Sequence, residues 1–120
     1  MNVRSGEEPP VPKGYVIVTE TIHDPAGMAA YSQLSGRSLA EYDGRVLVVD
    51  DAVEIREGSW PGSRTVVIEF ASVDQARAWY ESESYQAAAP LRQAAADCSV
   101  VIAAGFVPRP TPAPTATATG

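Results

Sequence analysis

Four segments rich in β-branched residues are spread along this chain, with helix-like sequence between some of them. The expected strands are residues 15–21, 45–49, 65–71 and 99–104, since β-branched residues favour extended structure. Helix-like sequence separates the first two strands and also the last two, so the order is β-α-β-β-α-β. This is the order of the ferredoxin-like split βαβ arrangement. The sequence therefore predicts an α+β fold with a four-stranded antiparallel sheet and helices on one face.

Both expected helices carry recognisable start signals. The first is predicted to begin at Asp24-Pro25, because Asp caps free amides and Pro suits the first helical position. It is predicted to end before Gly44, which stands where a left-handed residue is needed. The second is predicted to begin at residues 72–75, which have the S-x-x-Q form of a capping box. Pro90 removes an internal amide and is expected to kink or divide this second helix.

The strands are apolar on both faces. In the third strand Val66, Ile68 and Phe70 alternate with Thr65 and Val67, and strands of this kind need cover on two sides. Two helices can cover only one face of a four-stranded sheet. The other face is therefore predicted to pack against the same face of a second copy, which gives a homodimer.

The 120 residues suffice for one domain, which is predicted to span residues 13–107. Residues 1–12 contain three prolines and little to bury, so they are expected to form a disordered N-terminal segment. Residues 108–120 alternate Pro with Thr and Ala, which favours extended chain. They are expected to form a disordered tail.

Charge and residue counts exclude several functions. A net charge of −6 disfavours nucleic acid and anionic lipid as partners. The sequence has no apolar run long enough to span a membrane and no apolar stretch typical of a signal peptide, so a cytoplasmic location is expected. One cysteine, Cys98, and one histidine, His23, form no disulfide and no zinc cluster. No nucleotide-binding glycine motif is present, and neither a cofactor nor a metal is predicted.

Two motifs carry a resemblance to a known family. They are the Arg-x-x-x-Ile-Glu-Phe pattern of residues 64–70 and the Trp-Tyr-x-Ser-x-x-Tyr-Gln pattern of residues 79–86. With these motifs, about residues 13–105 resemble a bacterial domain-of-unknown-function family in the dimeric α+β barrel superfamily. The resemblance implies the fold and the dimer. It implies no single function, because relatives in the superfamily include cofactor-free monooxygenases, lactone isomerases, polyketide cyclases, haem enzymes and stress proteins.

Glu69 lies in the middle of an apolar strand, where burial would raise the pKa of its carboxyl group unless a cation pairs with it. It is a candidate for proton transfer in a pocket. The alternative is a structural ion pair with Arg45, Arg64 or Arg92. Strand alternation groups Glu69 with Thr65 and Val67, but does not tell whether their face meets the helices or a partner subunit.

His23 is the second candidate for proton transfer, since an imidazole titrates near neutral pH. It follows the first strand and precedes the first helix, where it can reach the mouth of a pocket. The alternative is a surface or capping residue.

Aromatic and arginine side chains on the helices are candidates for substrate binding. Tyr31, Tyr85 and Arg92 can bind a carbonyl or an anion, and Trp79 and Tyr80 can form a pocket wall; the alternative for the aromatics is core packing. Small residues of the first helix leave room for a ligand; they are Ser32, Ser35, Gly36 and Ser38.

These residues favour a cofactor-independent enzyme that acts on a small, partly apolar carbonyl compound. Isomerisation, cyclisation, dehydration and conjugate addition all need a base, a hydrogen-bond donor for a developing enolate and a dry pocket. Composition rich in Arg and Ala and poor in Lys suggests a GC-rich bacterium, where natural-product biosynthesis is one setting. The alternative function is a non-catalytic dimeric module that binds a small molecule or serves a stress response.

Overall fold

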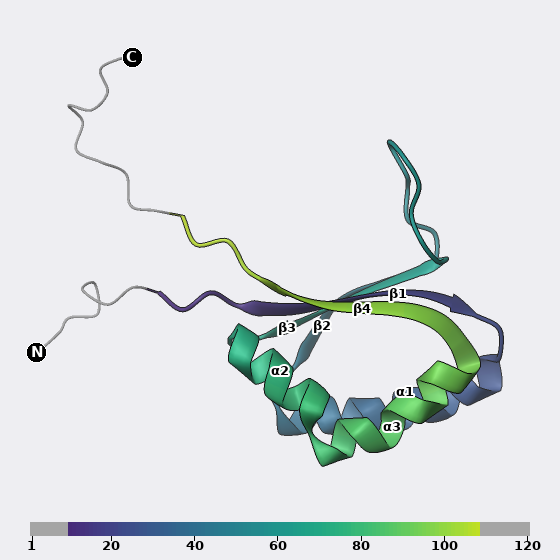
Figure 1. The fold of residues 1–120 in the computed structure, drawn as a ribbon, viewed down its shortest axis with the longest axis horizontal. Coiled ribbons are helices and arrows are strands. Elements are labelled where there is room, and N and C mark those ends of the chain that lie inside the picture. Colours follow the sequence, from purple (N-terminus) through teal and green to yellow (C-terminus); the bar gives the residue numbers. More distant parts are fainter. Residues whose placement is uncertain (1–9, 109–120) are drawn as a thin grey trace, which may run out of the picture.

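The computed structural model describes residues 10–108. Its elements are β1 (Gly14–Ile22), α1 (Pro25–Glu41), β2 (Arg45–Asp50), β3 (Arg64–Phe70), α2 (Val73–Glu81), α3 (Glu83–Ala95) and β4 (Ala96–Ala104). The strands form one antiparallel sheet in the order β2-β3-β1-β4, with all three helices on one face (Figure 1). The predicted ferredoxin-like α+β fold is confirmed. The disordered N-terminal segment and C-terminal tail predicted for residues 1–12 and 108–120 lie almost wholly outside the described residues.

The start of α1 follows the prediction, and its end differs in one residue. The Asp24 side chain accepts a hydrogen bond from the Gly27 amide at 3.2 Å, and Pro25 is the first helical residue. At the other end Asp43, not Gly44, takes the left-handed conformation, with φ of 56°. Gly44 is needed for a different reason, because a Cβ there would lie 2.8 Å from the Phe70 ring.

The second helical segment divides at Ser82 and not, as predicted, at Pro90. Ser82 is extended, and its hydroxyl caps both helices by donating to the Trp79 carbonyl at 2.7 Å and accepting from the Tyr85 amide at 3.1 Å. Pro90 lies inside α3 without ending it. The reason is that the Ser82 hydroxyl bonds a free carbonyl at the end of α2 and a free amide at the start of α3, so a break at this residue costs little free energy.

The connection between β2 and β3, residues 51–63, projects from the sheet on the side away from the helices (Figure 1); we call it the arm. Its base is fixed to the sheet by the ion pair of Asp51 with Arg64 and by the Ser63 amide, which donates to the Glu20 carbonyl at 2.8 Å. Trp60 also donates from Nε1 to Thr65 Oγ1 at 2.8 Å. The arm is therefore anchored beside the end of β1.

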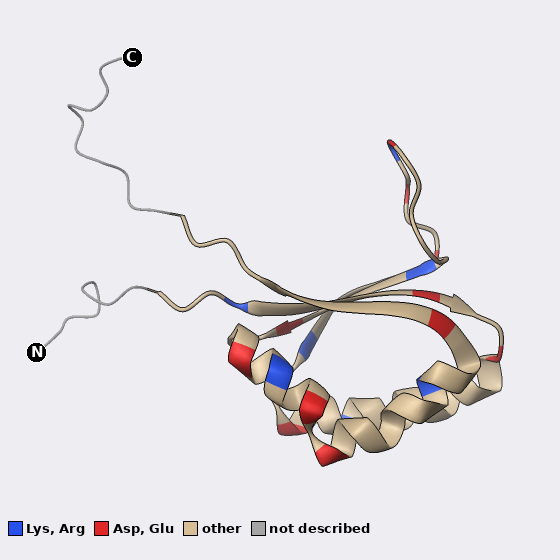
Figure 2. Ribbon diagram, viewed as in Figure 1, with Lys and Arg blue, Asp and Glu red and all other residues tan. Residues whose placement is uncertain are grey.

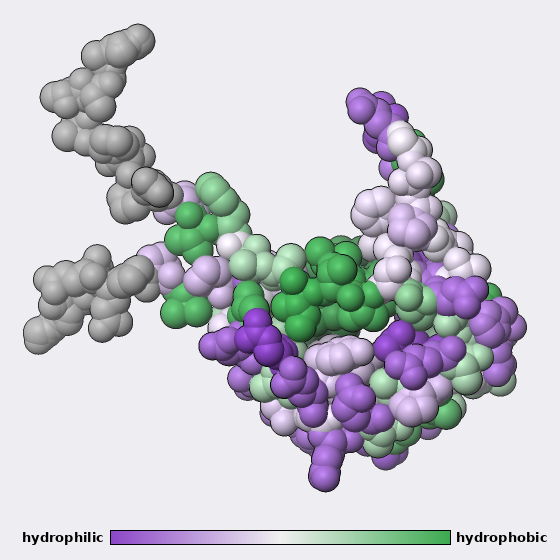
Figure 3. All heavy atoms as spheres, in the orientation of Figure 1, coloured by the Kyte–Doolittle hydropathy of each residue, from purple (hydrophilic) through white to green (hydrophobic). Residues whose placement is uncertain are grey.

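The two faces of the sheet differ in cover. On the helix side a buried cluster joins sheet and helices; it contains Val16, Val18, Ile68, Phe70, Ala76, Trp79, Tyr85 and Ala89. The opposite face, which we call the open face, exposes Val48 (39%) and Val101 (53%). Charged residues lie mainly on the helices, the strand ends and the arm (Figure 2), and an apolar area lies over β4 (Figure 3).

Candidate functional site

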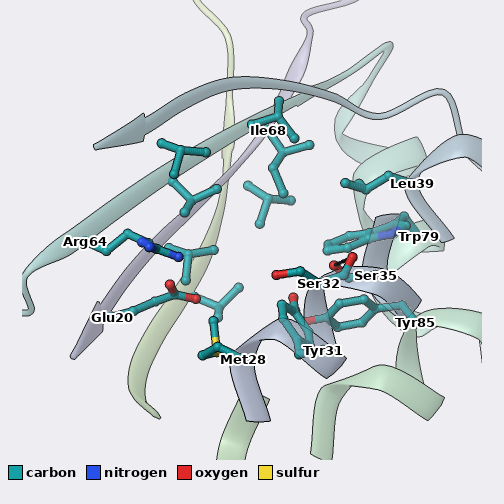
Figure 4. A pocket seen from close by; sticks show the side chains of 16 residues that line it. Glu20, Met28, Tyr31, Ser32, Ser35, Leu39, Arg64, Ile68, Trp79 and Tyr85 are labelled. Carbon is teal, nitrogen blue, oxygen red and sulfur yellow. Dashed lines mark hydrogen bonds between the residues drawn. The ribbon is translucent and has the colours of Figure 1, made fainter. Parts of the chain in front are cut away.

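A cavity of about 230 Å³ lies between α1 and the helix-facing side of the sheet. The sheet contributes Val16, Val18, Glu20, Val46, Val49, Arg64, Val66, Ile68 and Val100, and the helices contribute Met28, Tyr31, Ser32, Ser35, Leu39, Trp79 and Tyr85 (Figure 4). Most of these side chains are apolar. The polar ones come from the two sides of the cavity, which suits a ligand with an apolar body and one reactive polar group.

Small side chains of α1 leave this space open, as the sequence predicts. Ser32 and Ser35 line the cavity, so no large side chain fills it. Ser38 is fully buried beside it, accepts a hydrogen bond from Trp79 Nε1 at 2.9 Å and donates to the Ser35 carbonyl at 2.7 Å. These bonds hold the Trp79 indole in place as a wall. Gly36 is exposed and takes no part.

A bulge in β2 completes the wall on the sheet side. The pairing of β2 with β3 shifts register between Val46 and Val48, so Leu47 is the extra residue. Without a bulge, Val46 and Val49 would point to opposite faces, because strand side chains alternate. With it, both line the cavity.

Glu20 is the acidic group of the cavity. Only 3% of its surface is exposed, and its Oε1 has no hydrogen-bond partner among the described residues. Burial raises the pKa of the Glu20 carboxyl group, while the nearby cations Arg64 and Arg92 act in the opposite direction. A buried, unpartnered carboxyl group with a raised pKa is suited to accepting a proton.

Arg64 and Cys98 flank Glu20 on the neighbouring strands. The Arg64 guanidinium points toward the Glu20 carboxyl group at one end of the cavity (Figure 4), but its ion-pair partner is Asp51 at the base of the arm. The hydrogen bond with Asp51 raises the pKa of Arg64. The pKa of Asp51 is lowered by the same bond. Arg64 is therefore held charged at the cavity end by a residue outside the cavity.

A second polar group is a hydrogen-bonded chain of three side chains on the helix side of the cavity, two of which line it. The Tyr31 and Tyr85 hydroxyls lie 2.9 Å apart, and Arg92 Nε donates to the Tyr85 hydroxyl at 3.1 Å. The Arg92 guanidinium also lies 5.9 Å from the centre of the Tyr31 ring, within range of a cation–π interaction. Arg92 is only 4% exposed.

The pKa values of Tyr31 and Arg92 reflect the burial of these three hydrogen-bonded side chains. Burial is the largest cause of the raised pKa of Tyr31, and the neighbouring Tyr85 adds to it. For Arg92, burial is the largest single effect and acts to lower the pKa. Its interactions with the Cys98 thiol and the tyrosines outweigh that effect, so the pKa of Arg92 is raised. Tyr31 therefore stays protonated and Arg92 stays charged.

Glu69 lies on the open face and does not line the cavity. Tyr15 and Arg45 are its direct neighbours on the strands to either side. The Tyr15 hydroxyl donates to Glu69 Oε2 at 2.9 Å, and Arg45 pairs with Oε1 at 3.3 Å. The reason is alternation, since Ile68 and Phe70 face the helices and Glu69 between them must face away. The arrangement is the ion pair with Arg45 that the sequence leaves open as the alternative.

The other predicted site residues are divided between the cavity and its surroundings. Tyr31, Trp79 and Tyr85 line the cavity. Arg92 lies behind Tyr85, and Tyr80 packs against the core cluster with its ring centre 5.3 Å from that of Tyr85. His23 is exposed after β1 and is not among the cavity residues.

Glu20 is missing from the residues predicted from the sequence, although a signal for it exists. Val16, Val18 and Glu20 alternate along β1 just as Val66, Ile68 and Phe70 do along β3. Alternation therefore places Glu20 on the same face of β1 as Val16 and Val18, and the structure shows that this face is the helix side. The same pattern that places Glu69 on the open face places Glu20 toward the helices.

Within residues 10–108, no three side chains of the metal-binding types His, Cys, Asp and Glu come together. None of the helices in this part of the chain is long and apolar enough to cross a membrane.

The fold and cavity define a ferredoxin-like α+β domain with a ligand-sized space between its helices and its sheet. Residues 13–106 match the family described as a domain of unknown function, DUF1330. The chain belongs to this family, which confirms the resemblance seen in the sequence. No protein with a curated description is similar in sequence to this chain.

Two solved structures show the same fold. One is RPA0582 of Rhodopseudomonas palustris, a protein of unknown function, with 18% sequence identity, a TM-score of 0.64 and coverage of 81% of this chain and 85% of that chain. The other is SnoaB of Streptomyces nogalater, a cofactor-independent oxygenase, with 16% identity, a TM-score of 0.56 and coverage of 84% and 97%. At such identities the likeness is one of fold.

Proposed function

We propose that this protein is a cofactor-independent acid–base enzyme that acts on a small, partly apolar carbonyl compound in the cavity between α1 and the sheet. One observation carries the proposal: the Glu20 carboxyl group is buried, its Oε1 lacks a hydrogen-bond partner among residues 10–108, and it lies in a cavity that Tyr31 also lines (Figure 4). These two groups supply the base and the donor that proton transfer beside a carbonyl needs. The fold shared with the cofactor-independent oxygenase SnoaB supports it.

In the proposed reaction Glu20 removes a proton from the carbon next to the carbonyl group, and the electron pair of that bond forms an enolate. Tyr31 donates a hydrogen bond to the enolate oxygen and keeps its own proton. Glu20 then returns its proton to another carbon of the substrate, which gives isomerisation. In cyclisation or conjugate addition the enolate carbon instead attacks a second electrophilic group of the substrate, and the anion formed on that group takes the proton from Glu20. Leu39, Ile68 and Trp79 form the apolar wall that keeps water from the anion.

The test is exchange of carbon-bound hydrogen for deuterium, followed by NMR in D2O with a panel of cyclic ketones and 1,3-dicarbonyl compounds. We expect the protein to accelerate exchange of at least one compound, and Glu20→Gln to lower that rate by roughly 10²–10⁴. Glu69→Gln is the matched control, because it removes a mid-strand carboxylate from the open face, and it should retain exchange. Compounds that bind without exchange would contradict the proposal and favour the non-catalytic binding module. Exchange that survives in Glu20→Gln would contradict the assignment of Glu20 as the base.

We also propose that the active form is a homodimer in which the open faces of two sheets pack together. The open face carries Val48, Val67 and Val101 in one row across the sheet, and no helix of residues 10–108 covers this face (Figure 1). A second copy offers a matching apolar surface, and packing two such faces removes both from water.

A further inference from the structure

We propose that the cavity is an oxyanion site: it binds the ionised form of planar enols and phenols, and the charge of Arg92 reaches the ligand oxygen through Tyr85 and Tyr31. This inference deepens the proposed function and rests on it, because it names the class of ligand for the same cavity. Arg92 and Tyr85 are positioning residues, and Tyr31 is the group that touches the ligand.

The direction of the hydrogen bonds supports this assignment. An arginine can only donate, so the Tyr85 oxygen accepts from Arg92 Nε at 3.1 Å. The Tyr85 proton is then free to be donated to the Tyr31 oxygen, 2.9 Å away. Tyr31 in turn keeps a proton to donate, and Tyr31 lines the cavity. A chain of donors that begins at a cation strengthens each following donor.

The charges around Arg92, Tyr85 and Tyr31 also favour binding of an anion. Arg92 is buried, and no carboxylate of residues 10–108 forms an ion pair with it. Its neighbours are the Tyr85 hydroxyl, the Tyr31 ring and the Cys98 thiol. A buried cation without an ion-pair partner is unfavourable. Glu20, the buried carboxylate near enough to act on Arg92, becomes neutral when it takes a proton, and a negative oxygen bound at Tyr31 would then stabilise the site.

The remaining ionisable groups near the ligand are compatible with an anion there. Glu20 of β1 becomes neutral when it takes a proton from the ligand, so the total charge of the cavity stays constant as the ligand becomes negative. Arg64 of β3, which points toward Glu20 (Figure 4), is balanced by Asp51. An enolate formed by Glu20 therefore meets a neutral Glu20 and the Tyr31 donor. A phenolate taken up from solution meets the same partners when Glu20 takes up a proton from water.

The experiment is an absorbance titration of nitrophenols, whose ionised form absorbs at a longer wavelength, in the presence of the full-length protein. We expect the ionised form to bind about tenfold more tightly than the neutral form, so that the pKa of the bound nitrophenol falls by about one unit. Tyr31→Phe and Arg92→Met should abolish this preference. Tyr80→Phe is the matched control, because Tyr80 lies beside Tyr85 but outside the cavity lining, and it should retain the preference.

Tyr85→Phe is the second variant if Arg92→Met does not fold, because it removes one hydroxyl, keeps the ring and interrupts the chain. Preferential binding of the neutral phenol, absence of binding, or an unchanged preference in Tyr85→Phe would overturn the inference. Glu20→Gln separates the two proposals, since it should lose deuterium exchange and keep the phenolate preference. Exchange that depends on Glu20 without phenolate preference would leave the proposed function standing and refute the oxyanion site.

Discussion

Glu20 and Glu69 are both mid-strand carboxylates, yet the two faces of one sheet give them opposite surroundings. Glu69 accepts a hydrogen bond from Tyr15 and pairs with Arg45, whose side chain is 73% exposed. Glu20 is buried, and its Oε1 has no partner within residues 10–108. Neutralising Glu69 leaves a solvated arginine, which costs little. Neutralising Glu20 relieves a buried charge.

Glu20 is therefore expected to lower the stability of the protein as the pH rises. Burial raises the pKa of Glu20 in the folded state above its ordinary value, about 4.3 in the unfolded chain. Between these two values the folded state binds more protons, so the free energy of unfolding falls with increasing pH and stays reduced above the folded pKa. Glu20→Gln should raise the melting temperature at about pH 8 and change it little at about pH 4. A shift of equal size at both pH values would contradict this.

The sequence predicts Tyr31, Trp79 and Tyr85 as pocket residues, because aromatic side chains lie on the helices and the small residues of α1 leave room beside them. It does not distinguish Glu20 from Glu69, since both lie within apolar strands. The distinction requires knowing which face the helices cover. That face is determined by the packing of large side chains such as Phe70 against Trp79, whose ring centres lie 5.3 Å apart, and this contact is not local in sequence.

At the level of elements, the arm depends on close contact between its base and β1. Gly62 has φ of 77°, and a Cβ there would lie 2.7 Å from the Glu20 carbonyl oxygen. Gly58 has φ of 76° but open space around it. Both glycines therefore have a positive φ, but only Gly62 lies in close contact with another strand.

Gly62→Ala is expected to be more destabilising than Gly58→Ala. The alanine at 58 should cost about 1 kcal/mol for its positive φ, and the alanine at 62 about 2–4 kcal/mol, because the backbone of β1 must also move. Urea denaturation of both variants measures the difference. Equal losses would show that the base of the arm does not press on β1.

The order of the helices and strands is predictable from local patterns, whereas the exact break between α2 and α3 is not. Pro90 is the more conspicuous signal in sequence, but its effect is absorbed within α3. Ser82 ends one helix and begins the next with a single hydroxyl. Ser82 gives only a weak sequence signal for this break. Its partners are backbone groups of Trp79 and Tyr85, three residues before and three residues after it.

For the whole molecule, the open face makes the oligomeric state the decisive property. Sedimentation at micromolar concentration should give about twice the mass of one chain. Val101→Glu places a charge on the open face and should give a folded monomer. Ala87→Glu, on the exposed surface of α3, is the control and should remain dimeric. A folded wild-type monomer would contradict the proposed packing of two sheets.

The bulge in β2 also bears on aggregation. β2 is an edge strand, and all of its residues, RVLVVD, are exposed. An exposed edge with four consecutive apolar residues is a template on which strands of other molecules can pair. The bulge at Leu47 breaks the regular spacing of hydrogen-bonding groups at the centre of this edge, and Arg45 and Asp50 place opposite charges at its ends. The irregularity that shapes the cavity therefore also hinders the growth of an intermolecular sheet, and a variant with a regular β2 would precipitate more readily.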